Sequence, residues 1–323
     1  MAGARAHPDP PLPPLELAAR VGNPPGDDTL AEFDSFGARI RDAVLAELPD
    51  DWSFDGRRVL DFGCGSGRLL RHLFGEAAVA EIEGCDIDPA SVDWAGANLC
   101  PPIAAVFRCG SAPPLARPDE HYDLIVAFSV FTHIGAGWAE WLLEMHRVLA
   151  EDGILIASFL GRGAADMPLV PWDEDRIGMN VINLGRNYET GDPGVDVLHS
   201  RWWLRAHWGR AFEPLAIHLD GFPGFPEGQG HGVAVLRKRP VSVTAAELER
   251  EEPGEERYAP ARRTQLEQFH AEALALRADL AAEDEQLAEA LVFADEVMNS
   301  RSWRLTAPLR ALRARLGGTR RSV

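Results

Sequence analysis

The sequence predicts an α/β fold, a doubly wound sheet, followed by an α-helical extension. Three observations lead to this. Apolar runs of strand length alternate with amphipathic segments of helical spacing over roughly the first 240 residues. A glycine-rich turn follows the first apolar run. Beyond residue 240 the composition becomes rich in Ala, Leu and Glu. Continuous apolar strands that alternate with helices indicate a parallel sheet covered on both faces.

The first 27 residues are rich in Pro, Gly and Ala and contain few large apolar groups. Such a segment buries too little surface to offset its ordering entropy, so we expect a disordered arm over residues 1–27. It has no apolar stretch typical of a secretory signal, and no run of eighteen apolar residues occurs anywhere. We therefore expect a cytoplasmic protein whose four cysteines are reduced thiols.

The elements follow in order. Phe33, Phe36, Ile40, Val44 and Leu48 recur at helical spacing and predict the first long helix. Seven strands are expected, with the last pair antiparallel, at 58–62, 81–86, 103–109, 122–128, 153–160, 213–219 and 231–238. Helices are expected at 66–75, 89–99, 137–150 and 200–210, and a polar, glycine-rich insertion at 162–199. These elements make residues 28–240 one domain.

The segment after residue 240 divides into three parts: a charged linker over 241–263, a coiled coil over 264–298 and a basic amphipathic tail over 299–323. With heptad position a at Leu266, nine of the ten a and d positions are apolar, the exception being Glu283. We expect a homodimer through this seam. The alternative is a single amphipathic helix lying on the main domain.

The stretch "VLDFGCGSG" at 59–67 joins a strand, a glycine-rich turn and an expected helix, a combination typical of a nucleotide site. Its spacing is G-x-G-x-G, whereas dinucleotide folds need a glycine where Arg68 stands. Asp61 would repel a pyrophosphate and would suit a ligand with an ammonium group. Glycines after a strand can also serve only as a turn.

This loop, with "GCDIDP", "YDLIVAFSVFTHI" and "WLLEMHRVLAEDGILIASF" in the same order, resembles the class I S-adenosylmethionine-dependent methyltransferases over residues 33–238. The resemblance implies a Rossmann-like methyltransferase sheet and S-adenosyl-L-methionine as cofactor. The implied cofactor contacts are Asp61, Gly63 and Gly65 toward the methionine end, Cys64 and Gly67 in the same loop, Asp86 to the ribose hydroxyls, Ile87 and Ser111 to adenine, and Ser129 at the exit of the fourth strand.

Some of these residues differ from the family's usual residue, and one could serve a purely structural purpose. Asp86 alone would suit the cap of the helix beginning at Pro89. Many relatives have an acid near Ser111, and this chain has none. Glu151 and Asp152 replace a proline common after the fourth helix of the family.

The acceptor is expected to carry a hydroxyl, because no "NPPY"-like segment follows the fourth strand. His133 lies where acceptors bind in this family and is the predicted catalytic base, although it could merely cap its turn. His199 and His231 are weaker candidates. Trp172 and Tyr188 could line an acceptor pocket or only pack the insertion. No cluster of Asp and Asn indicates a magnesium site, so no metal is expected.

The net charge of −18 argues against nucleic acid as a partner. Seven arginines and no acid follow residue 296, so the tail is expected to contact a membrane surface or a glycosyltransferase complex at the inner face of the membrane. An ordinary basic tail is the alternative. "SRSWRLTAPLRALRARLGG" resembles a C-terminal element found beside coiled coils in bacterial surface-polysaccharide enzymes.

Three functions remain open. The first is methylation of a sugar hydroxyl in a surface glycan or its precursor, so that the acceptor is a small molecule or a glycan. The second is methylation of an unrelated small metabolite. The third is a non-catalytic coiled-coil assembly protein with a vestigial cofactor site. The intact Asp61, Gly63, Gly65, Gly67 and Asp86 speak against the third.

Overall fold

The computed structural model describes residues 10–20, 28–164, 172–187, 193–221, 231–308 and 310. Two compact units divide the chain after Gln268. The first unit, up to Gln268, holds the sheet and all the predicted site residues. The second begins at Phe269 and contains most of one long helix.

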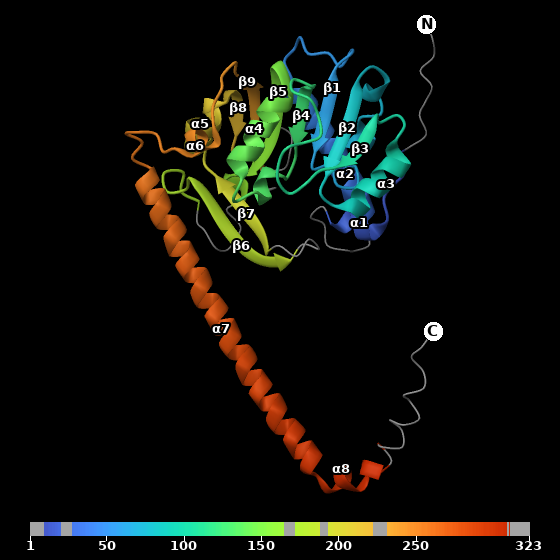
Figure 1. The fold of residues 1–323 in the computed structure, drawn as a ribbon, viewed down its shortest axis with the longest axis vertical. Helices are drawn as coiled ribbons and strands as arrows, with labels where there is room; N and C mark the ends of the chain where they lie inside the picture. Colours follow the sequence, from blue (N-terminus) through green and yellow to red (C-terminus); the bar gives the residue numbers. More distant parts are fainter. Residues whose placement is uncertain are drawn as a thin grey trace. The chain divides into compact units, whose positions relative to one another are not determined.

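Among the described residues, nine strands form one mixed sheet (Figure 1). Its parallel part has the order β3-β2-β1-β4-β5, and β9 then pairs antiparallel with both β5 and β8. This confirms the expected parallel sheet and its antiparallel last pair. The strands are β1 Arg58–Phe62, β2 Glu81–Asp86, β3 Ala105–Arg108, β4 Tyr122–Ala127, β5 Leu149–Leu160, β6 Met179–Asn187, β7 Pro193–His199, β8 Phe212–His218 and β9 His231–Lys238.

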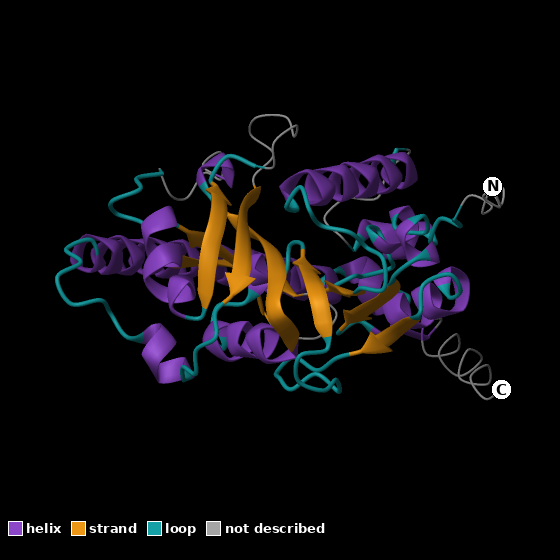
Figure 2. Ribbon diagram, turned by 90° about the horizontal axis from the view of Figure 1, so that it is seen from above, coloured by secondary structure: helices purple, strands orange, loops and turns teal. Residues whose placement is uncertain are grey.

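Alternate residues of each central strand pack into two different apolar cores. In β4, Ile125 faces the core that contains α4 and α5, while Leu124 faces the core that contains α2 and α3. Figure 2 shows the helices on both sides of the strands. This two-sided burial explains why the strands are continuously apolar in sequence. The main helices of the domain are α2 Thr29–Glu47, α3 Pro89–Leu99, α4 Trp138–Val148 and α5 Arg201–His207.

The segment 162–199, predicted as a polar insertion, contains an antiparallel hairpin of β6 and β7. The expectation of seven strands is therefore wrong by two. β7 joins the sheet only where Leu198 lies beside Leu160 at the end of β5, and it packs against the turn after β4. The hairpin was missed because glycine and polar residues interrupt the apolar alternation on which strand prediction depends.

The helix expected at 66–75 does not form. Residues 66–69 make turns, and only a short 3-10 helix, η1, follows at Leu70–His72. Gly67 has a φ of +82°, a left-handed conformation that cannot continue an α-helix. A second 3-10 helix, η2, lies at Glu76–Ala78.

The disordered arm expected over 1–27 is contradicted for residues 10–20. Leu15–Ala19 form helix α1, in which Leu17 and Ala18 are buried, and α1 packs against α2. Buried Leu17 and Ala18, an ion pair of Arg20 with Asp88 and a hydrogen bond from Arg71 to the carbonyl oxygen of Pro10 hold this proline-flanked segment on the domain. The rest of the predicted arm lies outside the described residues.

The expected linker at 241–263 is largely structured. It contains α6 Ala245–Glu249, which begins with a capping box between Thr244 and Glu247. Helix α7 Tyr258–Asn299 then starts inside the first unit, where Tyr258 and Ala261 are buried. The predicted coiled-coil segment is thus helical, while its self-association stays a prediction.

In the second unit, α7 continues to Asn299 and α8 follows at Arg301–Leu305. Most of the predicted basic tail, from residue 311 onward, lies outside the described residues. No helix in the part of the chain described here is long and apolar enough to cross a bilayer.

Candidate active site

The glycine loop lies at the carboxyl edge of the sheet, directly after β1. The backbone N–H groups of Gly63 and Cys64 both donate to the carbonyl oxygen of Cys85, at 2.8 and 3.0 Å, which ties the loop to the end of β2. Gly63 has a φ of +80°, and a Cβ there would lie 2.3 Å from Cγ2 of Val130. A side chain is therefore excluded, and the loop can approach the turn after β4 closely.

Gly67 packs closely against α3. A Cβ at this position would lie 2.2 Å from Cδ1 of Leu99 in α3. The glycine therefore makes room for a buried leucine, which accounts for the third glycine of the motif. Its predicted contact with the cofactor stays a prediction.

Asp86, at the end of β2, binds the backbone of the glycine loop. Its Oδ2 accepts from the backbone N–H of Gly65 at 2.7 Å, and its Oδ1 accepts from that of Asp88 at 2.9 Å. The helix-cap interpretation is wrong, because Asp88 caps α3 by accepting from Ala90. Each carboxylate oxygen still has lone pairs for further donors, such as a pair of ribose hydroxyls.

Asp61 is the most perturbed acid at this edge. Its residue is 3 % exposed, and its Oδ2 is buried without a hydrogen-bond partner among the described residues. Burial raises the pKa of Asp61, the nearby Arg68 guanidinium lowers it and the Asp86 carboxylate raises it, so that together they bring it to about 7. An orphaned buried acceptor of this kind is stabilised when a cationic donor binds beside it, so the site fits the ammonium end of S-adenosylmethionine.

Arg68 is a site residue that sequence analysis missed. Its guanidinium lies 4.7 Å from the ring centre of Phe36 and 5.7 Å from that of Phe128. Burial lowers its pKa to about 10, and nearby Asp61 counteracts this. In the sequence, Arg68 was only the residue that broke a dinucleotide motif; no spacing rule links it to aromatic residues on α2 and after β4.

The remaining predicted cofactor contacts lie along the same edge. Cys64 is buried within the loop, and burial raises the pKa of its thiol, which makes the thiol unreactive. Ile87, after β2, is 44 % exposed, as expected of an apolar side chain that could pack on a flat ring. Ser111 follows β3 and is exposed, and its carbonyl oxygen accepts from Nε1 of Trp141 at 3.3 Å.

Ser129, just after β4, has a φ of +60°, which is uncommon for a residue with a side chain. Its backbone N–H donates to Oγ of Ser158 at 2.6 Å, which holds this conformation. Its own Oγ lies 3.3 Å from Nε2 of His231 and 3.4 Å from Oγ1 of Thr132. His231 is thus engaged at the fourth-strand exit, beside a predicted cofactor residue.

His133 ends the 3-10 helix η3 Phe131–His133 and faces the hairpin. Its Nδ1 lies 2.9 Å from the carbonyl oxygen of Val195 and 3.2 Å from Oδ1 of the buried Asp196. A carbonyl oxygen only accepts, so Nδ1 carries the hydrogen and Nε2 carries the lone pair of the neutral ring. The side chain remains 36 % exposed.

The other residues predicted to act on the acceptor, or to line its pocket, lie in different surroundings. His199 is buried among Phe159, Trp203 and Trp208, and burial lowers its pKa to about 3, which leaves it a neutral core residue. Trp172 lines a pocket beside α5, whereas Tyr188 lies outside the described residues. Among the residues with described positions, no group of three or more His, Cys, Asp or Glu side chains is arranged to hold a metal ion.

Comparison with known proteins agrees with this geometry. Residues 33–185 match a family model described as a methyltransferase domain. Ubiquinone biosynthesis O-methyltransferase of Cereibacter sphaeroides is 30 % identical over 128 residues, which cover 38 % of this chain and 51 % of that protein. Malonyl-[acyl-carrier protein] O-methyltransferase of Halorhodospira halophila is 26 % identical over 147 residues, or 42 % and 46 % of the two chains. The chain spans about half the length of these relatives.

Solved structures are similar at lower identity. The S-adenosylmethionine-dependent methyltransferase of Mesorhizobium loti has a TM-score of 0.45 and 18 % identity, covering 61 % of this chain and 96 % of that one. A methyltransferase of Aquifex aeolicus has a TM-score of 0.39 and 15 % identity, covering 64 % and 98 %. Taken with the family match, the loop after β1 and the two acids that frame it show that residues 33–185 are a class I S-adenosylmethionine-dependent methyltransferase domain, whose cofactor is S-adenosylmethionine.

Proposed function

We propose that this protein is an O-methyltransferase that methylates a sugar hydroxyl of a surface glycan or of its precursor. The observation that carries the proposal is the contact of His133 with Val195 and Asp196 at the carboxyl edge of the sheet. The names of the two relatives, both O-methyltransferases, support oxygen as the acceptor atom. The tail's resemblance to those of surface-polysaccharide enzymes supports the sugar.

The cofactor, when bound, supplies an electrophilic methyl group on a sulfonium. The chain's own residues do the rest. Asp61 would accept from the ammonium group of the cofactor, and Asp86 would accept from its ribose hydroxyls. His133 Nε2 takes the proton of the acceptor hydroxyl, and the Asp196 carboxylate near Nδ1 stabilises the imidazolium that results. Alignment and exclusion of water contribute the remainder of the acceleration.

The test combines calorimetry with mass spectrometry. Titration with S-adenosylmethionine should give saturable binding by the full chain. Incubation with a glycan fraction should then add one methylene of mass to a sugar, and the demethylated cofactor should accumulate with it. Methylation of an unrelated small metabolite in place of the sugar would overturn the choice of acceptor. Absence of cofactor binding would overturn the enzyme itself.

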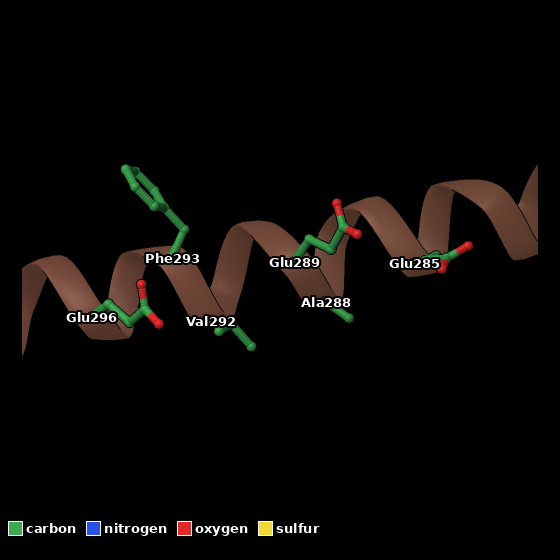
Figure 3. Close-up of a pocket in the computed structure, with 6 residues that line it drawn as sticks. All are labelled: Glu285, Ala288, Glu289, Val292, Phe293 and Glu296. Atoms are coloured by element: carbon green, nitrogen blue, oxygen red, sulfur yellow. The ribbon is translucent and has the colours of Figure 1, made fainter.

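We further propose that α7 associates with a second copy of the chain. Leu280 and Leu287, both at a positions, are 62 % and 59 % exposed in the single chain, so the seam leaves apolar surface in water. The surface widens near the end of the helix. Figure 3 shows Phe293 and Val292 pointing away from the helix toward different sides, outside the a and d seam, with Glu289 and Glu296 nearby.

Matched leucine substitutions test this association. Replacing Leu280 and Leu287 by Ser should lower the sedimentation coefficient to that of a monomer, because both a positions lose apolar contact. Leu274 lies on the same helix, is 50 % exposed and occupies position b, so Leu274→Ser is the control and should leave the dimer intact. If the unaltered chain, the double variant and Leu274→Ser sediment equally, the a positions do not hold a dimer together.

The basic tail is proposed to carry the dimer to an anionic membrane surface or a membrane-bound partner at the inner face of the membrane. Seven arginines after residue 296 support this, since each basic group near an anionic surface adds about 1 kcal/mol. Flotation with phosphatidylglycerol vesicles should retain the full chain and lose a variant whose seven tail arginines are glutamine. If both variants bind equally, the tail is not the anchor.

A further inference from the structure

A pocket of about 710 Å³ lies beside α5 in the first unit, a volume typical of small-molecule sites. Its walls come from the turn after β5, the segment before β6, the end of β8 and the start of α7. None of the proposed cofactor contacts lines it. Because β5 and β8 end at the carboxyl edge, the pocket lies on the same edge of the sheet as His133.

The pocket is positively charged within an acidic protein. Four arginines line it against two glutamates. Arg162 is held by Asp220 at 3.0 Å, and Arg257 by Glu255 at 2.6 Å. Arg201 and Arg205 are different, because neither side chain forms an ion pair or hydrogen bond with any other described residue. Two guanidinium groups that form no ion pair in one pocket favour an anionic ligand with a planar set of oxygens.

A second feature of the pocket favours hydroxyl groups. Glu174 lines it, and its Oε1 accepts from the backbone N–H of Arg201 at 2.8 Å. Its Oε2 is buried and has no hydrogen-bond partner among the described residues. Such an acceptor is satisfied by a ligand that brings a donor. Half-buried Trp172 adds an apolar wall, which suits the carbon face of a sugar ring.

One short stretch of chain joins the pocket to the contact of the proposed base. Asp196 contacts His133, and Arg201 follows Asp196 by five residues along β7 and the start of α5. Five residues span at most about 18 Å, which is an upper bound on the separation of Asp196 and Arg201. The pocket and His133 therefore belong to one region of the carboxyl edge.

We infer that this pocket binds the acceptor, and that the acceptor is a sugar bearing an anionic group, with its phosphate or carboxylate on Arg201 and Arg205 and a hydroxyl on Glu174. The inference rests on the proposed function and specifies its substrate class. It requires no residue of the cofactor site.

Calorimetry on the full chain at low salt tests the assignment, with glucose 1-phosphate, glucuronate, glucose and inorganic phosphate as probes. One of the two anionic sugars should bind at least tenfold more tightly than either glucose or inorganic phosphate. Tighter binding of glucose 1-phosphate would identify the anionic group of the acceptor as a phosphate, and tighter binding of glucuronate would identify it as a carboxylate. The Arg201→Gln/Arg205→Gln double variant should lose at least tenfold of that affinity.

Two further variants refine the test. Arg239 is exposed beyond the end of β9, at the opposite edge of the sheet, so Arg239→Gln is the charge-matched control and should bind as the unaltered chain does. Glu174→Gln keeps the acceptor for Arg201 but weakens the buried one. It should reduce binding of the anionic sugar severalfold and leave inorganic phosphate unchanged.

The outcomes separate this inference from the proposed function. S-adenosylhomocysteine should bind the unaltered chain and the arginine double variant equally. If it does so while no anionic sugar binds better than glucose and inorganic phosphate, the acceptor pocket is overturned and the methyltransferase stands. If the anionic sugar binds the double variant as tightly as the unaltered chain, the pocket is likewise overturned. Failure of S-adenosylhomocysteine to bind any variant would instead overturn the proposed function.

Discussion

Two halves of one sheet edge differ in how they are built. At the ends of β1 and β2, Asp61 and Asp86 are held within a tight loop whose contacts are mostly local to two strand ends. At the ends of β4 and β5, His133 depends on Asp196 from an inserted hairpin, and the nearby pocket offers Arg201 and Arg205. The first half presents acidic side chains, of which Asp61 is buried, and the second presents exposed basic side chains. The comparison teaches that the cofactor half is preorganised for a cation, whereas the acceptor half is assembled from distant segments and suits an anion.

The largest expected effect tests the acceptor half. His133→Ala should lower kcat by about 10²–10⁴-fold, because a general base contributes that much. Cofactor affinity, measured by calorimetry, should change little. Turnover that is unaffected by the substitution would return His133 to a structural role.

Asp196→Asn separates positioning from catalysis in the same half. It should lower kcat less than His133→Ala and shift the acid limb of the pH–rate profile, because the imidazolium loses its carboxylate. Asp93→Asn, on the exposed face of α3, is the matched control. A pH profile identical to that of the unaltered chain would remove Asp196 from the mechanism.

The next effect concerns the cofactor half. Asp86→Ala should weaken S-adenosylhomocysteine binding by roughly 100-fold, since two hydrogen bonds to a charged group contribute about 3 kcal/mol or more together. It should also loosen the loop, because Gly65 and Asp88 lose their acceptor. Calorimetric Kd values measure the first effect, and hydrogen exchange at Gly65 the second. Undiminished affinity would show that the ribose binds elsewhere.

The smallest expected effect concerns Asp61 and is a change of about tenfold in the Kd of the cofactor with pH. Its pKa is raised to about 7, mainly by burial, so the ionised form needed for the cofactor ammonium is lost as pH falls through 7. The Kd should therefore be about tenfold weaker at pH 6 than at pH 8. Asp61→Asn should bind weakly at both pH values and flatten the profile.

The same variant probes the stability of the empty site. In the folded chain the Asp61 carboxyl holds its proton to higher pH than in the unfolded chain, so the stability that this carboxyl contributes at low pH is lost as pH rises from about 3.8 to about 7, and the full loss persists above pH 7. Asp61→Asn should raise the free energy of unfolding by about 1–3 kcal/mol at pH 8 and by much less at pH 4. Thermal unfolding without cofactor measures this, and a loss of stability at pH 8 would contradict the burial argument.

The difference between local contacts in one half and contacts of distant segments in the other explains what could be predicted from the sequence. β1, β2, α3 and β9 occur at their predicted bounds, because buried apolar runs and a capped start are local signals. Asp61 and Asp86 could be singled out because they stand near the end of β1 and at the end of β2, and their contacts with the cofactor stay predictions. Asp196 was not, because its contact with His133 crosses more than 60 residues and no sequence period records it. The helix predicted at 66–75 failed for a similar reason, since Gly67 adopts a left-handed φ where Leu99 of a different element leaves no room for a Cβ, and no local pattern records that contact.

One contact at the far side of the hairpin has a consequence for any shortened version of the chain. β6 is the last strand of the sheet, and its outward N–H and C=O at Val181 are both taken by the side-chain amide of Gln265, at 2.7 and 2.9 Å. A glutamine here imitates a neighbouring strand and protects an edge that would otherwise pair with another chain. A protein ending at Pro240 would lose this protection together with buried Leu248 and Tyr258. Such a protein would be prone to aggregate edge to edge, so a truncation meant to remove self-association has to end after Gln268.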